Sequence, residues 1–429
     1  MMRRYLITLV VFIIFLLTGC ASTATLPSPN LSPPTHHFGI AIVRQDIDGI
    51  TGLGIRWDRT LVGPFIWGRI EPEKGRYEWR EVDEYVHKVQ SYDIATVATI
   101  RPFAEWDQAN WGPAGTTPLI FEEEGLYRSR HKPYDMQAYK RFVSALVERY
   151  DGDGIGDMPG LKYPIKYWEA SNEPAMQSGY FTSFEGSPED YVEVLKATYE
   201  AVKEADPEAK VLHAGMAGMY PDVLSFWKPI FEEGSSYFDI ANIHSFGPSE
   251  LSPKAEMIVP EFKNLLSKYG IDKPIWVTEA QYDMGEISGV GYVSSEEHAQ
   301  TLVKSYVVAF AWGADNIFYT FFRAYPPHPP QLKRTALIDE NDEIRPAYYA
   351  LKTLIQKLDK FTSAEKLAEG QYEFIVEGKV IDVLWGSGKI PEEITGEVLV
   401  TDIYGKETTT NCSAITLGES PIFLEKHPH

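Results

Sequence analysis

Short apolar segments alternate with longer amphipathic segments from Phe38 onward, and this alternation is the clearest pattern in the chain. Eight of the short segments are rich in Val, Ile, Phe and Ala, as expected of strands buried on both faces of a parallel sheet. The eight predicted strands are 38–43, 54–58, 94–101, 166–170, 210–214, 238–244, 275–278 and 316–321. The pattern therefore predicts an α/β protein in which helices connect parallel strands.

Three of the connecting segments carry helix signals. Residues 135–150 place their apolar side chains on one helical face, and Ser187 followed by Pro188 is a good start for a helix over 187–205. Residues 294–312 begin with serines and acidic side chains, which suit the positive end of a helix dipole. Eight strands with helical crossovers favour a closed (β/α)8 TIM barrel over 38–360. The first strand lacks a following Gly-x-Gly-x-x-Gly motif, which disfavours a dinucleotide-binding sheet.

The pattern changes after residue 360. Short segments at 372–376, 380–385, 397–403 and 421–424 are separated by Gly and Pro, which predicts strands joined by turns. The tail is too short for a second catalytic domain, so we expect residues 361–429 to form a small β domain packed on the barrel. This domain is either a structural cap or a separate glycan-binding module.

The N-terminus has the pattern of a targeting signal. Arg3 and Arg4 precede an apolar stretch over 6–17 that is too short for a comfortable membrane span, and Leu-Thr-Gly-Cys then ends at Cys20. This end resembles the bacterial lipobox, which implies a signal peptide over 1–20 and lipidation of Cys20; a plain signal peptide and an uncleaved anchor are the alternatives. Residues 21–37, rich in Pro, Ser and Thr, then form a linker. The resemblance implies an exported bacterial lipoprotein of the cell envelope, on the outer membrane or cell surface.

The charge of the chain excludes several classes of partner. The net charge of −21 argues against nucleic acids and against docking on anionic lipid headgroups, so membrane contact is expected through the N-terminal lipid only. A polyanionic substrate would be repelled at long range, whereas a neutral glycan would be indifferent to the charge. Aromatic residues make up 13% of the chain, which suits a carbohydrate substrate because rings stack on the apolar faces of sugars, although core packing explains most of them.

Cysteine usage limits the means of stabilisation. With Cys20 lipidated, Cys412 is the one cysteine left, so no intramolecular disulfide is expected and stability must come from core burial. The sequence has no Cys/His cluster with zinc spacing. We expect a monomer that requires no cofactor.

Two glutamates stand at the carboxyl ends of predicted strands, where the active site of a TIM barrel lies. Glu173 belongs to WEASNEP (168–174) after the fourth strand, and Glu279 ends WVTE (276–279) on the seventh. The first segment resembles the W-E-x-x-N-E-P signature of clan A glycoside hydrolases, and the second resembles their nucleophile strand. The resemblance implies that Glu173 is the acid/base, Glu279 the nucleophile and Asn172 a ligand of the sugar 2-hydroxyl. The segment 67–79 resembles one found in several clan A families, among them families 39, 42 and 10. The chain as a whole is most similar to family 39-like or to family 42-like or family 5-like glycosidases.

A retaining glycosidase needs both carboxyl groups. One must protonate the departing glycosidic oxygen, and the other must attack the anomeric carbon from the opposite side. The two groups must lie about 5–5.5 Å apart, since a larger gap admits the water of an inverting enzyme. The fourth and seventh strands lie across the mouth of a barrel from each other and could set that gap. Two unrelated acidic residues are the alternative, which the intact Asn-Glu-Pro motif disfavours.

The resemblance also implies substrate-binding roles around the pair. Arg56 matches an arginine that orients the carboxylates, with pairing to Asp58 as the alternative. His244 matches a histidine at the end of the sixth strand. Phe246 stands where the family pattern has a tyrosine, so Tyr282 in the following loop is expected to replace that hydroxyl.

Aromatic side chains are the expected sugar platforms. The eighth strand offers Tyr319, Phe321 and Phe322 in place of the tryptophan that often lies beneath the sugar. Trp106, which follows the third strand, is the favoured platform.

A calcium loop is the one metal site that the sequence suggests. Asp151, Asp153 and Asp157 alternate with glycines over 151–157, and oxygen ligands on a tightly wrapped backbone are what calcium requires. The segment lacks the full EF-hand spacing, and a solvated Gly-rich turn is the alternative.

These observations predict a retaining glycoside hydrolase that cleaves β-glycosidic bonds of a plant-type or microbial polysaccharide or oligosaccharide by double displacement. The alternatives are a catalytically inactive glycan-binding lipoprotein, a transglycosylase on the same scaffold and an inverting hydrolase.

Overall fold

The computed structural model describes residues 35–41, 46–61, 63–112, 129–177, 182–250, 254–325 and 330–426. The predicted signal peptide over 1–20, with Cys20, and nearly all of the linker over 21–37 lie outside these ranges. Within the described part of the chain, no helix combines the length and the apolar character needed to cross a bilayer.

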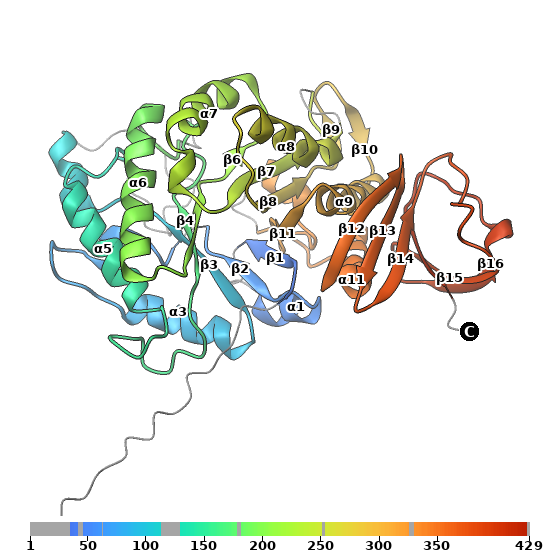
Figure 1. The fold of residues 1–429 in the computed structure, drawn as a ribbon, viewed down its shortest axis with the longest axis horizontal. Helices are drawn as coiled ribbons and strands as arrows, with labels where there is room; N and C mark the ends of the chain where they lie inside the picture. The colour runs from blue at the N-terminus through green and yellow to red at the C-terminus, as the bar shows by residue number, and fades with distance from the viewer. Residues whose placement is uncertain are drawn as a thin grey trace, which may run out of the picture. The chain divides into compact units, whose positions relative to one another are not determined.

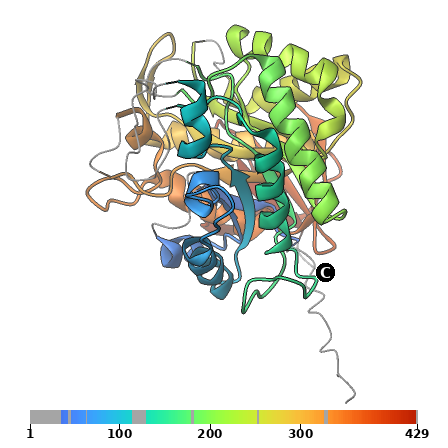
Figure 2. The ribbon, with the colours of Figure 1, turned by 90° about the vertical axis from the view of Figure 1, so that its left-hand side faces the viewer.

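Eight parallel strands form the central sheet, with helices around it (Figure 1, Figure 2). They are β1 (Phe38–Ala41), β2 (Trp57–Arg59), β3 (Ala95–Ile100), β4 (Tyr167–Ala170), β5 (Lys210–His213), β7 (Ala241–Gly247), β8 (Ile275–Tyr282) and β11 (Ala314–Tyr319). They are paired in the order β5-β4-β3-β2-β1-β11-β8-β7, and the short β6 (Met216–Ala217) extends the sheet beside β7. A parallel bridge between Leu212 and Ile240 closes the ring. The predicted (β/α)8 barrel is therefore confirmed, and each of the eight strands overlaps its predicted segment.

The helices that surround the strands include the three predicted ones. The α-helices are α1 (Ile47–Gly52), α2 (Trp67–Ile70), α3 (Arg80–Ser91), α4 (Glu105–Gln108), α5 (Met136–Glu148), α6 (Pro188–Ala205), α7 (Pro221–Glu233), α8 (Ile258–Lys268), α9 (Ser295–Ala311), α10 (Pro330–Thr335) and α11 (Pro346–Leu358). Short 3-10 turns are η2 (Ala109–Trp111), η5 (Ser235–Tyr237), η6 (Ala255–Met257) and η7 (Cys412–Ala414). Reciprocal capping boxes begin two of the predicted helices, with Ser187 and Asp190 at α6 and Ser294 and Glu297 at α9.

The interior of the barrel is layered by the alternation of side chains along its strands. The lowest layer is a buried apolar cluster of Trp57, Ala95, Val97, Leu212, Ile240, Trp276 and Phe318. On β3, Val97 belongs to this layer, and Thr99 points the same way one step higher, where it reaches Glu169. The same alternation turns Arg101, just past the end of β3, toward the interior. The interior of the barrel is therefore apolar toward the amino ends of the strands and polar and charged toward their carboxyl ends.

A β-bulge in β8 brings two consecutive side chains into the interior. Ile243 pairs with Val277, but His244 pairs with Glu279, so Thr278 is an extra residue in β8. The pairing of β8 with β11 also shifts by one residue at this point. As a result, Thr278 donates to Glu169 while the adjacent Glu279 accepts from Arg59, both within the barrel.

The chain after α11 forms a six-stranded antiparallel sheet in the order β12-β13-β14-β17-β15-β16. Its strands are β12 (Phe361–Ala368), β13 (Gln371–Val376), β14 (Lys379–Leu384), β15 (Glu397–Asp402), β16 (Glu407–Asn411) and β17 (Ile422–Lys426). The sheet contacts α9 and α11 of the barrel, and the Phe361 ring stacks on His37 at 4.0 Å between centroids. The predicted C-terminal β module is therefore confirmed. A separate hairpin of β9 (Gly285–Ile287) and β10 (Gly291–Val293) follows β8.

Candidate active site

An arginine on β2 and a glutamate on β4 form the centre of a buried ionic network. Arg59 and Glu169 are both 0% exposed. The Nε of Arg59 donates to Oε2 of Glu169 at 2.7 Å and its Nη2 donates to Oε1 at 2.9 Å, so the two planar groups meet through two parallel bonds. Two further donors of Arg59 point toward the mouth of the barrel. Nη1 donates to Oε1 of Glu279 at 2.6 Å, and Nη2 donates to the side-chain oxygen Oδ1 of Asn172 at 2.6 Å. One guanidinium thus fixes three side chains of the site.

The Glu169 carboxylate is also held by uncharged donors. It accepts from the Thr99 hydroxyl at 2.6 Å, the Asn242 amide at 2.6 Å and the Thr278 hydroxyl at 3.1 Å. Burial acts to raise the pKa of Glu169, but the charge and hydrogen bonds of Arg59 outweigh it, so the pKa is lowered and the group stays ionised. A buried charge that is fully paired and hydrogen-bonded makes a rigid support for the residues above it.

Glu279 lies directly above this network and is 4% exposed. Its Oε1 accepts from Arg59, and its Oε2 lies 3.4 Å from the amide of Gln281. Burial raises the pKa of the Glu279 carboxyl, and the Glu173 charge raises it further, while His244 and Arg59 act to lower it; the net direction is upward.

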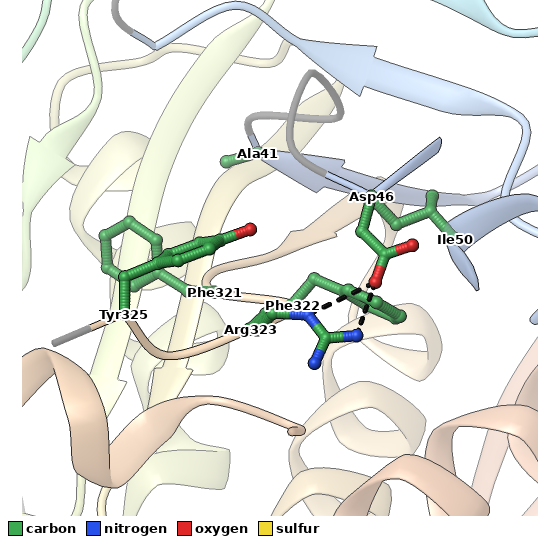
Figure 3. Close-up of a pocket in the computed structure, with 7 residues that line it drawn as sticks. All are labelled: Ala41, Asp46, Ile50, Phe321, Phe322, Arg323 and Tyr325. Atoms are coloured by element: carbon green, nitrogen blue, oxygen red, sulfur yellow. Dashed lines mark hydrogen bonds and ion pairs between the residues drawn. The ribbon is translucent and has the colours of Figure 1, made fainter. Parts of the chain in front are cut away.

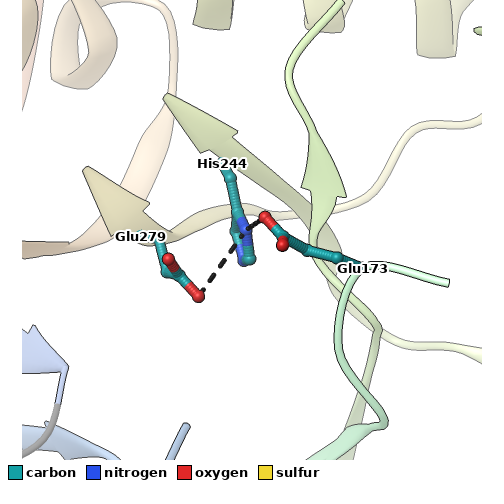
Figure 4. Close-up of side chains that lie close together, drawn as sticks. All are labelled: Glu173, His244 and Glu279. Atoms are coloured by element: carbon teal, nitrogen blue, oxygen red, sulfur yellow. Dashed lines mark hydrogen bonds and ion pairs between the residues drawn. The ribbon is translucent and has the colours of Figure 1, made fainter. Parts of the chain in front are cut away.

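Glu173 faces Glu279 across the ring of His244 (Figure 4). One oxygen of each carboxylate and a ring nitrogen of His244 all lie within 4.8 Å of one another. The backbone at Glu173 has φ of +39° and that at Ser171 has φ of +75°, values that L-residues rarely adopt. Such conformations persist only where the surroundings impose them, and here they turn the segment after β4 so that Glu173 points into the mouth of the barrel.

His244 links Glu173 to the network below it. The Nδ1 of His244 is 2.7 Å from Oε1 of Glu173, and its Nε2 is 3.0 Å from the Thr278 hydroxyl. The Thr278 hydroxyl in turn lies 2.9 Å from the side-chain oxygen of Asn242 and 3.1 Å from Oε1 of Glu169. The imidazole therefore holds Glu173 by a hydrogen bond beside Glu279.

The structure places Arg59, and not Arg56, beside the carboxylates. The predicted strand ended at Asp58, whereas β2 extends to Arg59, whose side chain points inward. Arg56 precedes β2 and donates to the carbonyl of its neighbour Ile55 at 2.8 Å. The expected arginine is thus present three residues later, and the placement of Arg56 is wrong. Asn172 lies where expected, 5% exposed and held by Arg59.

Tyr282 and Tyr319 lie away from the carboxylate pair. Side chains alternate along β8, so Tyr282 points outward when Glu279 and Gln281 point inward. It interacts with Ser305 of α9, and burial raises its pKa to about 12. Tyr319 is fully buried behind β11, where its hydroxyl donates to the Thr335 carbonyl at 2.6 Å. The structure therefore brings neither tyrosine to the pair, in contrast to the expectation.

Trp106 is half-buried at the start of α4. Its Nε1 donates to the Glu71 carbonyl at 2.8 Å, and its ring packs edge-on against Trp67 with centroids 5.0 Å apart. Its role as a sugar platform stays a prediction. A second tryptophan, in η2 just after α4, is more exposed: Trp111 is 43% exposed and packs edge-on against Tyr134.

Several residues of the network escaped the sequence analysis. Glu169 lies within the WEASNEP motif, between the apolar residues Trp168 and Ala170 of a predicted buried strand. A charged side chain in that setting must be paired, and this was the signal in the sequence that could have identified it. Asn242 and Thr278 had no such signal, because isolated polar residues in strands are common and the bulge that turns Thr278 inward is not visible in the sequence.

The predicted calcium ligands converge in the loop after α5. Asp151, Asp153 and Asp157 each offer a carboxylate oxygen, and these atoms lie within 4.8 Å of one another. The carboxylates also accept backbone N–H groups of the loop, such as Gly152 to Asp157 at 3.1 Å. Calcium binding stays a prediction: it would raise the melting temperature, and Asp153→Ala would remove that rise.

A separate hollow lies at the ends of β1 and β11, where the chain enters α1 (Figure 3). Ala41, Asp46, Ile50, Phe321, Phe322, Arg323 and Tyr325 line it. The Arg323 guanidinium is already paired with Asp46, at 2.7 Å and 3.2 Å, so it stabilises the wall of the hollow.

No family model matches this sequence, and no curated protein sequence matches it. Similar solved structures do exist. A family 39 glycoside hydrolase from Bacteroides cellulosilyticus WH2 matches with a TM-score of 0.63 and 17% identity, over 92% of this chain and 81% of that one. A glucosidase from Croceicoccus marinus matches with a TM-score of 0.58 and 13% identity, over 92% of this chain and 97% of that one. A GH30 endoxylanase from Clostridium papyrosolvens C71 matches with a TM-score of 0.56 and 13% identity, over 91% of this chain and 96% of that one. The chain has the fold of these glycoside hydrolases, which confirms the predicted resemblance at the level of fold.

Proposed function

We propose that the protein is a retaining glycoside hydrolase that cleaves a β-linked glycan. The observation that carries the proposal is the convergence of Glu173 and Glu279 within 4.8 Å at the active face of the barrel. Retaining enzymes hold their carboxyl groups about 5–5.5 Å apart, whereas inverting enzymes need about 6.5–9.5 Å to admit water. The separation here therefore supports attack by a carboxylate rather than by water.

The proposed reaction proceeds in two displacements. In the first, Glu279 attacks the anomeric carbon and Glu173 gives its proton to the departing oxygen, which breaks the glycosidic bond and forms a glycosyl ester on Glu279. In the second, Glu173 takes a proton from water, which attacks the same carbon and releases Glu279. His244 holds Glu173 by a hydrogen bond in position for the first step, and Arg59 holds Glu279 in position and favours its ionised form. Both steps use the side chains of the chain itself and require no cofactor.

Replacement of the nucleophile tests the mechanism. Glu279→Ala should abolish turnover of an activated aryl β-glycoside, and added azide should restore it with an α-glycosyl azide as product. Glu286→Ala, which changes an exposed glutamate on β9, is the matched control and should keep full activity. Unchanged activity in Glu279→Ala would remove Glu279 from the mechanism. An inverted anomer in the first product, followed by NMR, would refute the retaining route.

Two rivals share this geometry and differ in outcome. A glycan-binding protein would retain sugar but release no product from any glycan. A transglycosylase would pass the glycosyl group to an added acceptor sugar in preference to water, which product analysis with and without acceptor would reveal.

We also propose that lipid on Cys20 anchors the protein to the bacterial cell envelope. The lipobox-like sequence before Cys20 supports this. Cys20→Ser should move the protein from the detergent phase to the aqueous phase in phase partitioning, whereas Cys412→Ser should not.

A further inference from the structure

Arg101 is a buried cation, and two of its three side-chain nitrogens have no hydrogen-bond partner among the described residues. Its side chain follows β3, on the inward side of the barrel, and the residue is 3% exposed. Its backbone is fixed on both sides, since its N–H donates to Phe65 at 3.0 Å and its carbonyl accepts from Trp67 at 3.0 Å. Among the described residues, however, Nε and Nη1 of Arg101 have no hydrogen-bond partner. Buried guanidinium donors left unsatisfied are costly, so their retention calls for a physical reason.

The other charges nearby do not supply the missing partner. Arg59 is paired with Glu169 and Glu279. Arg130, which is also buried, interacts with Glu185. Burial lowers the pKa of Arg101 to about 10, and the charges of Arg130 and Arg59 add to this effect, while Glu169 and Glu173 oppose it. Of the two carboxylates whose charges act on Arg101, Glu169 is already paired with Arg59, which leaves Glu173.

The proton on the general acid removes the negative charge of Glu173. This step rests on the proposed function, in which Glu173 must be protonated before it can donate to the leaving group. Glu169 is committed to Arg59, so Glu173 is the carboxylate left, among the described side chains whose charges act on Arg101, to balance it. In the working state Glu173 is neutral, and Nε and Nη1 of Arg101 still have no hydrogen-bond partner among the described residues. A neutral sugar would leave the charge of Arg101 unbalanced.

We propose that Arg101 binds the carboxylate of a uronic acid, so that the glycan ring held at Glu173 and Glu279 is a uronosyl residue. A carboxylate on the sugar would supply both the negative charge and the acceptor oxygens that Arg101 lacks, and charge-assisted bonds between guanidinium and carboxylate are strong. The net charge of −21 does not contradict this, because salt screens charges beyond about 8 Å at physiological ionic strength, whereas a buried pair in contact is screened much less.

Matched pairs of substrates test the inference. β-Linked glucuronate and mannuronate oligosaccharides are each compared with the same oligosaccharide after carboxyl reduction, which replaces the carboxylate by a hydroxymethyl group and leaves the linkage unchanged. The wild-type protein should cleave at least one acidic member with a kcat/KM at least about tenfold above its reduced partner, the factor expected for a well-formed charged hydrogen bond. Arg101→Met should abolish this preference, and Arg101→Lys should keep part of it. Arg80→Met, which removes a cation that is 84% exposed, is the control for net charge and should keep the preference.

The stability of Arg101→Met separates a ligand-binding role from a structural one. Removal of an unpaired buried cation should leave the melting temperature of the free protein unchanged or raise it. A structural arginine would instead cause a clear loss of stability. A clear fall in the melting temperature of Arg101→Met would therefore contradict the inference, as would equal cleavage of acidic and reduced members with both lowered alike by the substitution.

A binding measurement keeps this inference distinct from the proposed function. D-Glucuronate or D-mannuronate should raise the melting temperature of the wild-type protein, D-glucose and D-mannose should not, and Arg101→Met should remove the rise. If no glycoside is cleaved but a uronate binds through Arg101, the hydrolase proposal fails and the carboxylate site stands. If neutral glycosides are cleaved and no uronate binds, the carboxylate site fails and the hydrolase proposal stands.

Discussion

The two sides of the carboxylate pair differ in how their charges are balanced. Below the pair, Arg59 and Glu169 meet through two parallel bonds, and three neutral donors complete the carboxylate. Beside the pair, just past the end of β3, Arg101 is also buried but keeps two donors without partners among the described residues. Both sides use guanidinium groups at the ends of neighbouring strands, so the fold alone does not explain the contrast.

The contrast separates residues that position the catalytic side chains, such as Arg59 and Glu169, from a residue that is suited to binding a ligand, Arg101. A fully paired network keeps its arrangement with or without substrate, and it can therefore preorganise Glu279 and Asn172. An unpaired buried cation is complete only when something else binds, so it is suited to selecting that ligand. The predictions that follow disturb first the paired network, then His244 and Glu173 beside it, and last the long-range charge that an acidic substrate meets.

Removal of one charge from the paired network should have the largest effect. Glu169→Gln leaves Arg59 with half of its buried counter-charge, and breaking a buried ion pair costs about 3–5 kcal/mol. We expect a loss of that size in the free energy of unfolding, measured by denaturant titration, together with loss of turnover. Glu84→Gln is the matched control, because Glu84 pairs with Arg80 on the exposed face of α3 and such pairs contribute about 0–1 kcal/mol. Equal effects of the two substitutions would show that the network is not the support described here.

A smaller change should displace His244 without altering any charge. A Cβ on Gly215 would lie 1.8 Å from Nε2 of His244, so in Gly215→Ala the imidazole must move and the Glu173 contact must change. A misplacement of about 1 Å near a reacting group can lower the rate about 10²-fold. We expect a fall of that order in kcat/KM. Gly52→Ala is the control, because nothing lies within 4 Å of its added Cβ. Wild-type activity in Gly215→Ala would contradict the role of His244.

The sequence was sufficient for the strands and the carboxylate pair because both depend on local patterns. Runs of apolar residues identified all eight barrel strands, and the NEP motif and the end of the seventh strand identified Glu173 and Glu279. Arg59 was missed because the predicted second strand ended one residue too early. In a strand, the facing of a side chain changes with every residue, so a boundary error of one is enough to misplace a site.

Other features were hidden because they depend on contacts between distant strands. The bulge at Thr278 is defined by its pairing with β7 and β11, and the missing partners of Arg101 can be seen only when its surroundings are known. β12 and β16 were missed for a different reason: as edge strands they are almost wholly exposed and carry no apolar pattern.

The pH profile should reflect the burial of Glu279. Glu279 must be ionised to attack, and burial raises its pKa, so kcat/KM should fall on the acid side at a pH above the usual range of a glutamate. Glu173 is already neutral on that limb, so Glu173→Gln should leave the acid limb in place. The measurement uses an aryl glycoside whose leaving group needs no acid. An acid limb that moves to lower pH in Glu173→Gln would show that Glu173 is ionised in the working state, against its role as the proton donor.

Ionic strength should have the smallest effect, and it distinguishes the field of the whole protein from that of Arg101. With a net charge of −21, the protein repels a polyuronate at long range, and the screening length falls from about 30 Å at 0.01 M salt to about 8 Å at 0.15 M. We therefore expect kcat/KM on β-linked polyglucuronate to rise about two- to fivefold over this range, since steering acts on the association rate. The carboxyl-reduced polymer carries no charge and should show no change. A steady fall of kcat/KM with salt would instead mean that attraction to positive charge at the site governs association. The long-range repulsion inferred from the net charge would then not affect this substrate.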